Sequence, residues 1–223
     1  MIVPQSRKER ERESRRKEIL ASARSVFSEK GYSRATLEEI AQRAEFGKGT
    51  LYNYFVGGKE ELLFTVIEQM YDEVHTLITD HFESAGADQP MRPVLRALIF
   101  KILSYYENHQ DTFMILVKEV QRLLINGDEK AAYFIKQRNR LIEALEAPLS
   151  QAIQSGQLRP LPPRAVANMF LGNVHGCQMH VFLDQEHGQV DNACRADKNA
   201  EFLTTMLLDG LLVSQPVAEE STQ

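Results

Sequence analysis

Residues 36–63, TLEEIAQRAEFGKGTLYNYFVGGKEELL, have the pattern of two short helices joined by a turn and followed by a third helix. Thr36 and Glu39 have the spacing of a capping box, in which each side chain accepts a backbone N–H of the other residue. Apolar residues then recur at helical intervals as far as Ala44, so one face of the first helix is predicted to be buried. The turn contains Gly47, and the second helix is predicted over residues 48–55. The stretch therefore predicts a helix-turn-helix.

The second short helix combines one apolar face with a polar surface. Leu51 and Phe55 lie four residues apart and are expected to point inward together. A short helix with small, hydroxyl-bearing and cationic side chains can enter the major groove of DNA. At its start, Lys48 could reach guanine O6 and N7, and Thr50 a thymine methyl group or a phosphate. The candidate DNA-contacting residues of this helix are Lys48, Gly49, Thr50, Tyr52, Asn53 and Tyr54.

The same residues resemble those of the TetR family of one-component transcription regulators. The resemblance covers about 60 residues and rests on Ile40-Ala41, on KGTLYNYF at residues 48–55, on KEELL at residues 59–63, and on the upstream helix RRKEILASARSVFSEKGY. Three positions depart from the family pattern. Glu45 stands where a glycine is usual, Gly47 where a serine is common, and the loop at residues 56–58 is one residue longer than the commonest version. The angle and base preference of the second helix are therefore less constrained than its presence.

The resemblance also implies which residues contact the DNA backbone. In the family these contacts are commonly made by the residues that match Thr36, Tyr52, Tyr54 and Lys59. Lys59 begins the next predicted helix, and the amides and dipole at a helix N-terminus favour an anion. The alternative for the segment is an ordinary surface helix with packed aromatic side chains.

The rest of the chain shows only helical patterns. Apolar stripes predict further helices over about residues 14–30, 59–82, 92–108, 112–125, 128–155, 164–184 and 196–213, which makes about nine helices in all. Residues 1–12 are expected to be frayed or extended, and Asp111 and Asp128 to cap helices. The prediction is an all-α fold with an N-terminal three-helix DNA-binding domain, residues 1–62, and a larger helical domain for ligand binding and dimerisation, residues 63–223.

Composition and charge agree with this division. The hydrophobic content of 43% and charged content of 26% are those of an ordinary soluble globular protein. Residues 1–62 hold 13 Lys/Arg and 10 Asp/Glu, whereas residues 63–223 hold 13 and 21, so a basic end precedes an acidic body. The sequence has neither an apolar run of membrane-spanning length nor a secretory signal. We therefore expect a cytoplasmic protein without a membrane partner, and Cys177 and Cys194 as thiols rather than a disulfide.

No pattern in the sequence requires catalysis, a cofactor or a metal. The segment HGCQMH, residues 175–180, contains possible metal ligands, but His175 and Cys177 would face opposite sides of a helix and only Cys177 and His180 share a face. No nucleophile–histidine–acid cluster or phosphate-binding loop is present. The sequence therefore predicts neither a metal site nor an enzyme.

The TetR resemblance implies that the helices of the body enclose a pocket for a small effector. Methionine and aromatic side chains suit an apolar ligand, with Tyr105, Arg138 and His175 as candidate polar contacts. The full candidate set is Phe100, Tyr105, Phe113, Met114, Tyr133, Phe134, Arg138, Met169 and His175. The alternative is a filled core.

The last two predicted helices are apolar on broad faces. Gly172 and Gly176 lie four residues apart, which leaves a bare stripe where another backbone can approach closely. In the family, the final two helices pair with their copies in a four-helix dimer interface. The candidate interface residues are Gly172, Gly176, Met179, Phe202, Met206 and Gly210. Packing within one chain is the alternative.

The sequence thus predicts a homodimeric, ligand-responsive transcription regulator that binds a double-stranded DNA operator. Repression is favoured, with release from a pseudo-palindromic operator by a small apolar or amphipathic effector. One alternative is a small-molecule carrier or an enzyme with a vestigial helix-turn-helix, and another is an activator or an architectural regulator without a ligand. The operator sequence, the effector and the regulated genes are not specified by the sequence.

Overall fold

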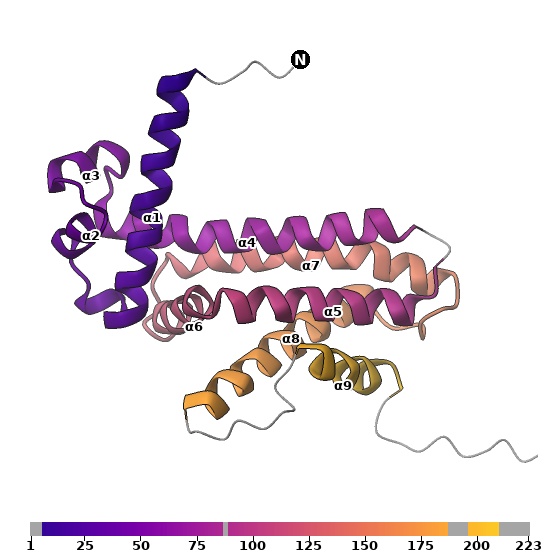
Figure 1. Cartoon of the computed structure of the whole chain (residues 1–223). Coiled ribbons are helices and arrows are strands. Elements are labelled where there is room, and N and C mark those ends of the chain that lie inside the picture. Colours follow the sequence, from indigo (N-terminus) through magenta and orange to yellow (C-terminus); the bar gives the residue numbers. More distant parts are fainter. Residues whose placement is uncertain (1–5, 87–88, 187–195, 210–223) are drawn as a thin grey trace, which may run out of the picture. The chain divides into compact units, whose positions relative to one another are not determined.

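The computed structural model describes residues 6–86, 89–186 and 196–209. In this part of the chain every regular element is an α-helix, and nine are present (Figure 1). Their bounds are α1 Arg7–Arg34, α2 Leu37–Arg43, α3 Lys48–Tyr54, α4 Gly58–Ala85, α5 Met91–Asn108, α6 Gln110–Ile125, α7 Ala131–Gln154, α8 Pro163–Glu186 and α9 Ala196–Leu208. The all-α prediction is therefore confirmed. None of these helices is long and apolar enough to cross a membrane.

The first helix begins earlier than predicted. The Glu9 N–H donates to the Ser6 hydroxyl at 3.2 Å, and the Ser6 N–H donates to the Glu9 carboxylate at 2.7 Å, so a capping box starts α1 at Arg7. The expectation that residues 1–12 are frayed is wrong from Arg7 onward. Near the other end Gly31 has φ 74°, in the left-handed region, where the helix kinks before its last turn.

Two predicted helix caps are also wrong. The N-cap of α6 is His109 rather than Asp111, which lies within the first turn of the helix. Asp128 does not begin α7 but accepts the N–H of Lys130 at 2.9 Å in the turn before it. Both aspartates stand near a helix start, so the sequence located the breaks but not the capping geometry. The predicted end of the last helix at residue 213 lies outside the described residues.

The chain packs as two compact units that differ from a simple N-terminal and C-terminal division. The first unit comprises residues 1–80 and 105–144, and the second comprises residues 81–104 and 145–223. Helices α4, α5 and α7 each contribute residues to both units. The predicted division into residues 1–62 and 63–223 separates DNA binding from ligand binding and dimerisation rather than one compact unit from another. It stays a prediction.

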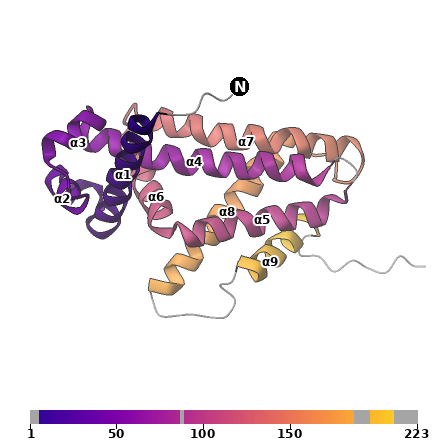
Figure 2. The same cartoon turned by 45° about the horizontal axis from the view of Figure 1, so that its top comes forward.

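In the first unit, α1 packs against both α2 and α6. Figure 2 shows α1 foreshortened, with α2 and α3 beside it. The apolar stripe of α1 is fully buried, and an ion pair fastens its outer face to α2, since Arg43 Nη2 lies 2.8 Å from Glu29 Oε2. A second donor of the same guanidinium contacts Ser25 Oγ at 2.6 Å. The short α2 is thus held against a long helix rather than standing alone.

Candidate nucleic-acid interface

The start of α2 is fixed by the capping box that the sequence predicts. The Glu39 N–H donates to Thr36 Oγ1 at 3.3 Å, and the Thr36 N–H donates to Glu39 Oε2 at 3.1 Å. Ile40 and Ala41 are buried on the inner face. Thr36 itself is exposed, and its hydroxyl proton remains available for an acceptor such as a phosphate oxygen.

The turn between α2 and α3 contains a residue in an unfavourable conformation. Glu45 has φ 58°, the only left-handed φ among the described residues that are not glycine. The turn is closed by the N–H of Phe46, which donates to the Ala41 carbonyl at 2.9 Å. A glycine would adopt this φ without steric cost. The position where the chain departs from the TetR pattern is therefore the position where the backbone favours glycine.

Helix α3 follows Gly47, which is its N-cap and provides no side-chain hydrogen bond. Leu51 and Phe55 are 0% exposed, as predicted from their spacing. Because they anchor the inner side, the opposite side of the helix is turned outward. Of the six candidate residues on α3, Thr50 and Tyr54 are half-buried and the exposed ones are Lys48, Gly49, Tyr52 and Asn53.

In this structure the cation at the start of α3 is paired with an acid of α2. Lys48 Nζ donates to Glu38 Oε1, and both side chains are exposed. The hydrogen bond raises the pKa of Lys48 and lowers the pKa of Glu38, so both groups are charged near neutral pH. A phosphate or a guanine that binds Lys48 would therefore compete with Glu38 for the same ammonium.

Lys59 makes structural contacts that sequence reasoning missed. Its ammonium donates to the carbonyl oxygens of Tyr32 at 2.9 Å and Ala35 at 3.0 Å, with a longer contact to Ser33 at 3.4 Å. It also lies 4.5 Å from the centroid of the Tyr32 ring. Lys59 thus joins the beginning of α4 to the last turn of α1. Its predicted contact with the DNA backbone is untested, but its ammonium is already well supplied with acceptors.

The N-terminus of α4 is closely packed. The Gly57 N–H donates to the Glu61 carboxylate at 2.7 Å, so an anion of the chain itself caps this end. Gly58 has φ 63°, and a Cβ there would lie 3.3 Å from Leu37 Cδ1 and 3.6 Å from Tyr52 Cε1. The loop at residues 56–58 therefore depends on a glycine at position 58. Only a residue without a Cβ adopts this φ easily and leaves room for Leu37 of α2 and Tyr52 of α3.

Two arginines of α1 were not among the candidates, yet they lie on α3 and the residue that ends it. The guanidinium carbon of Arg16 is 5.1 Å from the centroid of the Phe55 ring, and that of Arg12 is 6.0 Å from the centroid of the Tyr54 ring. The sequence contains a pattern that could have identified them, the Ser6-x-x-Glu9 capping box. It indicates that α1 begins before Arg12 and Arg16.

A capped α2 packed on α1, a tight turn, and a short α3 packed on α2 with its polar side exposed define a helix-turn-helix DNA-binding protein. Residues 19–66 match the family model described as "Bacterial regulatory proteins, tetR family". These residues of the chain are thus the DNA-binding region of a TetR family transcription regulator.

Curated relatives extend the likeness beyond these residues. The chain is 29% identical over 164 residues to the HTH-type transcriptional regulator YhgD of Bacillus subtilis, which covers 70% of this chain and 78% of YhgD. It is 28% identical over 148 residues to the HTH-type transcriptional repressor KstR2 of Mycobacterium tuberculosis, which covers 66% of this chain and 70% of KstR2. The names of both relatives describe transcription regulators.

Solved structures share the fold. Bacillus subtilis FadR in complex with stearoyl-CoA superposes with a TM-score of 0.69 at 20% identity, over 87% of this chain and 98% of FadR. PfmR of Thermus thermophilus, a TetR family regulator, superposes with a TM-score of 0.68 at 23% identity, over 87% of this chain and 99% of PfmR.

The candidate effector residues are distributed over both compact units. Phe113 and Phe134 are each 1% exposed, Met114 is also buried, and Phe100 is 41% exposed. Tyr105 donates its hydroxyl to the Glu73 carboxylate at 2.7 Å, and burial, with Glu73, raises its pKa. Tyr133, Arg138 and His175 are half-buried. Several of these side chains are therefore core residues or already bonded within the chain.

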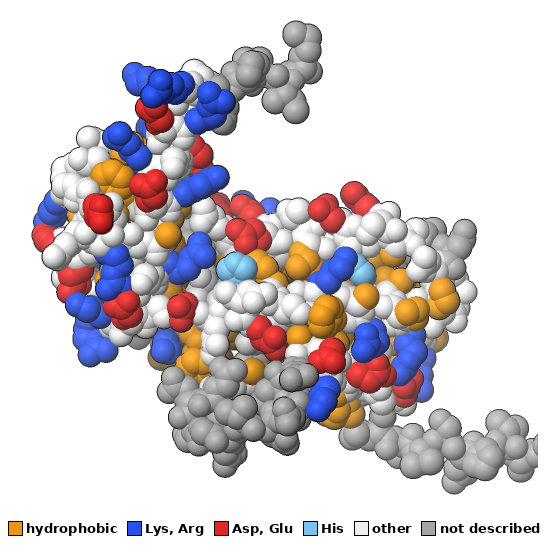
Figure 3. All heavy atoms as spheres, in the orientation of Figure 1, with side chains coloured by type: hydrophobic (Ala, Val, Ile, Leu, Met, Phe, Trp, Pro, Cys, Tyr) orange, Lys and Arg blue, Asp and Glu red, His pale blue; other side chains and the backbone are white. Residues whose placement is uncertain are grey.

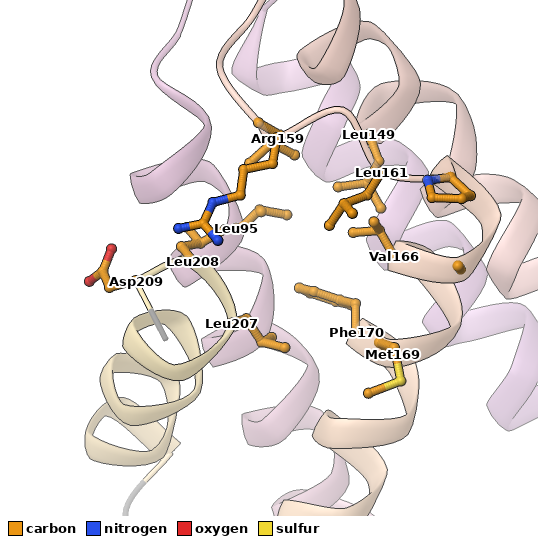
Figure 4. Close-up of a pocket in the computed structure, with 13 residues that line it drawn as sticks. Leu95, Leu149, Arg159, Leu161, Val166, Met169, Phe170, Leu207, Leu208 and Asp209 are labelled. Carbon is orange, nitrogen blue, oxygen red and sulfur yellow. The ribbon is translucent and has the colours of Figure 1, made fainter. Parts of the chain in front are cut away.

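A cavity of about 330 Å³ lies within the second unit. Of the candidate effector residues, only Met169 lines it. Figure 4 shows that its two charged side chains, Arg159 and Asp209, lie together on one side, while Phe170 and Val166 line another. The remaining lining residues are Leu95, Leu149, Leu158, Leu161, Pro162, Ala165, Leu207 and Leu208.

The candidate interface residues that the structure describes on α8 and α9 are exposed or half-buried. Gly172 and Gly176 are exposed, and a Cβ built on either would have no atom within 4 Å. Phe202 is 60% exposed, and Met179 and Met206 are half-buried. Gly210 lies outside the described residues. The glycines therefore do not serve close packing within the described chain.

Potential metal ligands are scattered over the described ranges. These ranges contain no group of three or more His, Cys, Asp or Glu side chains that could hold a metal ion. Cys194 lies outside them, so its predicted thiol state stays a prediction.

Proposed function

We propose that this chain is a homodimeric transcription repressor that binds a pseudo-palindromic operator and is released by a small amphipathic effector. The observation that carries the proposal is the geometry of α3, whose polar residues are exposed because Leu51 and Phe55 are fully buried. A dimer would present two such helices, with half-sites about 34–36 Å apart or a multiple of that spacing. The proposal includes a cytosolic location, where the operator would be reached.

The cavity in the second unit supports an effector of this class. A volume of about 330 Å³ is that of a small-molecule site, and most of its lining is aliphatic or aromatic. Arg159 would attract an acidic group at one end of a ligand whose remaining length is apolar. The structural relative FadR was solved with stearoyl-CoA, an amphipathic anion. Long-chain acids and their thioesters are therefore the first compounds to test.

The exposed face of α8 and α9 supports the dimer. Met169 and Phe202 are 63% and 60% exposed, and large apolar side chains in these positions favour association with another surface. A two-fold contact is also what a palindromic operator requires. Repression rather than activation is supported by relatives such as KstR2, whose name describes a repressor.

The DNA part of the proposal is tested by fluorescence anisotropy with the DNA upstream of the chain's own gene and with a scrambled duplex. Wild-type protein should prefer the upstream DNA and bind it less tightly as salt rises. The double variant Lys48→Ala/Thr50→Ala should lose the preference while keeping its thermal stability. A carrier or an enzyme would bind neither duplex, and that result would exclude the proposal.

The effector part is tested by thermal shift with long-chain acids and thioesters, followed by operator titration with each stabilising compound. Coupling of about 1–3 kcal/mol predicts a loss of operator affinity of roughly 5–150-fold. Val166→Trp should fill the cavity and abolish both responses. Ile135→Trp, at a position 47% exposed on α7, is the matched control and should keep both. Stabilisation without any change in operator affinity would leave a binding site but no regulation.

A further inference from the structure

We propose that the first turns of α1 form a second DNA-contact surface, which binds the phosphate backbone beside the α3 site. Its cations are Lys8, Arg12, Arg15 and Arg16. The assignment rests on the operator binding proposed above and adds a site that no helix-turn-helix residue supplies.

These cations continue the buried stripe of α1 toward its N-terminus. Ile19, Ala23 and Val26 form part of that stripe and are at most 1% exposed. The same helical spacing, continued toward the N-terminus, reaches Arg16, Arg15, Arg12 and Lys8. At 100° per residue the four cations lie within an arc of about 100°, and residues 7–18 place no carboxylate in that arc. The face that is apolar in the core thus becomes cationic where the helix leaves it.

Contacts with α3 show which way this cationic stripe faces. Arg12 lies over the ring of Tyr54 and Arg16 over the ring of Phe55, at 6.0 Å and 5.1 Å. Tyr54 is one of the candidate DNA-contacting residues. Since Arg12 is exposed although it touches Tyr54, its guanidinium has donors left for a phosphate. The stripe is therefore continuous with the surface of α3.

Three of the four neighbouring acids are engaged by residues of the helix or by its N-cap. Glu9 accepts the Ser6 N–H, Glu11 lies 2.8 Å from Arg7, and Glu18 accepts the Ser14 hydroxyl at 3.1 Å. Residues 7–18 contain seven Lys/Arg and four Glu. Figure 3 shows the Lys and Arg side chains gathered at this end of α1. The net positive charge is therefore concentrated on the stripe rather than cancelled around the helix.

The dimensions suit a duplex. Lys8 and Arg16 are separated by about 12 Å along the helix axis, which is between three and four base-pair steps of about 3.4 Å. Figure 1 shows the N-terminal turns of α1 extending beyond α3. Phosphates flanking the bases that α3 reads would meet the stripe. An acidic protein could also match the charge, but continuity with α3 favours DNA.

Two triple variants with equal charge test the assignment. The stripe variant is Lys8→Gln/Arg12→Gln/Arg15→Gln, and the control is Arg7→Gln/Arg10→Gln/Lys17→Gln, which removes three cations from the opposite face of the same turns. Operator affinity is measured by anisotropy from 50 to 300 mM salt, with circular dichroism and thermal melting to confirm that both variants fold. Gln is a good helix former, so α1 should persist in both.

The stripe variant should lower the slope of log affinity against log salt by about 2 to 5 across a dimer, and weaken binding at 0.15 M salt by at least about tenfold. The control should show less than half of both effects. The preference for operator over scrambled duplex should not change, because phosphate contacts carry no sequence information. Lys8→Gln/Arg15→Gln, which leaves Arg12 on Tyr54, should retain most of the loss and thereby exclude a displaced α3 as its cause.

Equal losses in the stripe and control variants would overturn the assignment, because they would indicate net charge alone. Unchanged affinity and slope in the stripe variant would also overturn it, and would leave the cations for an acidic protein. Failure of the wild-type chain to bind any duplex would instead refute the proposed function. Hydroxyl-radical footprints give an independent readout, since flanking protection should be lost only in the stripe variant.

Discussion

Helix α3 and the α8/α9 pair are both exposed, but they differ in what they leave uncovered. Leu51 of helix α3 and Phe55, the residue that ends it, are completely buried, and the helix exposes polar side chains. Helices α8 and α9 pack on each other yet leave Met169 and Phe202 more than half exposed. A polar surface is stable in water, whereas exposed large apolar side chains favour association with another surface. The candidate DNA-reading surface is thus complete in one chain, while the α8/α9 face is completed by a second copy in the proposed dimer.

The largest expected effect tests this contrast directly. Phe202→Asp places a charge on the α8/α9 face and should convert the dimer into monomer or aggregate. Operator affinity should fall by at least about 100-fold, although the residue touches no DNA, because two linked half-sites become independent. Light scattering at micromolar protein and operator titration measure the two effects.

Ile125→Asp is the matched control for this variant. Ile125 is 83% exposed on α6, so the same substitution is made on an apolar side chain outside the α8/α9 face. The control should remain dimeric. Gly176→Leu, where the added side chain meets open space within the chain, should behave like Phe202→Asp. A stable dimer in both α8/α9 variants would locate the interface elsewhere and remove the comparison.

The next prediction compares how Lys48 and Lys59, two candidate DNA-contacting residues, contribute to stability. Lys59→Ala removes donors from two close carbonyl contacts and a cation over Tyr32, so it should lower the free energy of unfolding by about 1–2 kcal/mol. Lys48→Ala removes only an exposed ion pair and should leave the stability almost unchanged. Denaturant unfolding compares the two.

The same variants should differ in DNA binding. Lys59→Ala should weaken all duplexes similarly, and Lys48→Ala should also blur base preference. If Lys59→Ala unfolds like the wild type, the contacts to the end of α1 contribute nothing. In that case Lys59 would belong to the DNA surface alone.

A smaller effect concerns the turn before α3. Glu45→Gly should raise the free energy of unfolding by about 0.5–1 kcal/mol, because glycine has no Cβ to oppose φ 58°, although its greater freedom when unfolded offsets part of the gain. Glu45→Ala keeps the Cβ and serves as the control for the lost charge. Equal stabilisation by both substitutions would attribute the effect to charge instead of strain.

The smallest expected effect is a pH dependence of the free energy of unfolding, which His81 of the second unit causes. Burial lowers the pKa of His81 below its ordinary value of 6.5, against the opposing hydrogen bond to the Val94 carbonyl, and Lys101 lowers it further. Below about pH 6.5 the unfolded chain therefore binds a proton that the folded chain does not. The contribution of His81 is present above that pH and is lost as the pH falls toward the lower folded pKa.

This pH dependence is measured by denaturant unfolding at several values between pH 7.5 and pH 5. The wild type should lose more stability over this range than His81→Gln, which does not titrate there. Parallel curves for the two proteins would show that His81 does not contribute. A difference between the two stability curves would extend the comparison of α3 with the α8/α9 pair. It would show that pH affects the unit that contains α8 and α9, while the contacts of α3 stay unchanged.

Helical spacing in the sequence predicts part of both surfaces. The α3 surface depends on local order: Thr36 and Glu39 cap α2, and Leu51 and Phe55 orient α3, all within one short stretch. Such patterns are readable because helix periodicity fixes which residues share a face. The same reasoning found Gly172 and Gly176 and correctly expected a bare stripe on α8.

Interactions between distant residues were less predictable. The cavity contains Leu95, Arg159 and Leu207, which come from α5, a connector and α9, and no local spacing brings them together. Lys59 looked like a phosphate ligand because it begins a helix, but its contacts depend on where α1 ends. The length of α1 was missed because its charge pattern lacks the apolar stripe that marks the rest of the helix.

The pair between Lys48 and Glu38 has a consequence for selectivity. Glu38 acts as an internal competitor in the proposed operator complex, since a duplex that engages Lys48 must share the ammonium with, or take it from, a carboxylate that is already bound to it. On arbitrary DNA this contact would gain little, because the ammonium already has an anionic partner. On an operator, the proposed base contacts by α3 would add to it. The intramolecular pair would therefore lower the affinity for every duplex that engages Lys48, and only duplexes with further base contacts would stay well occupied.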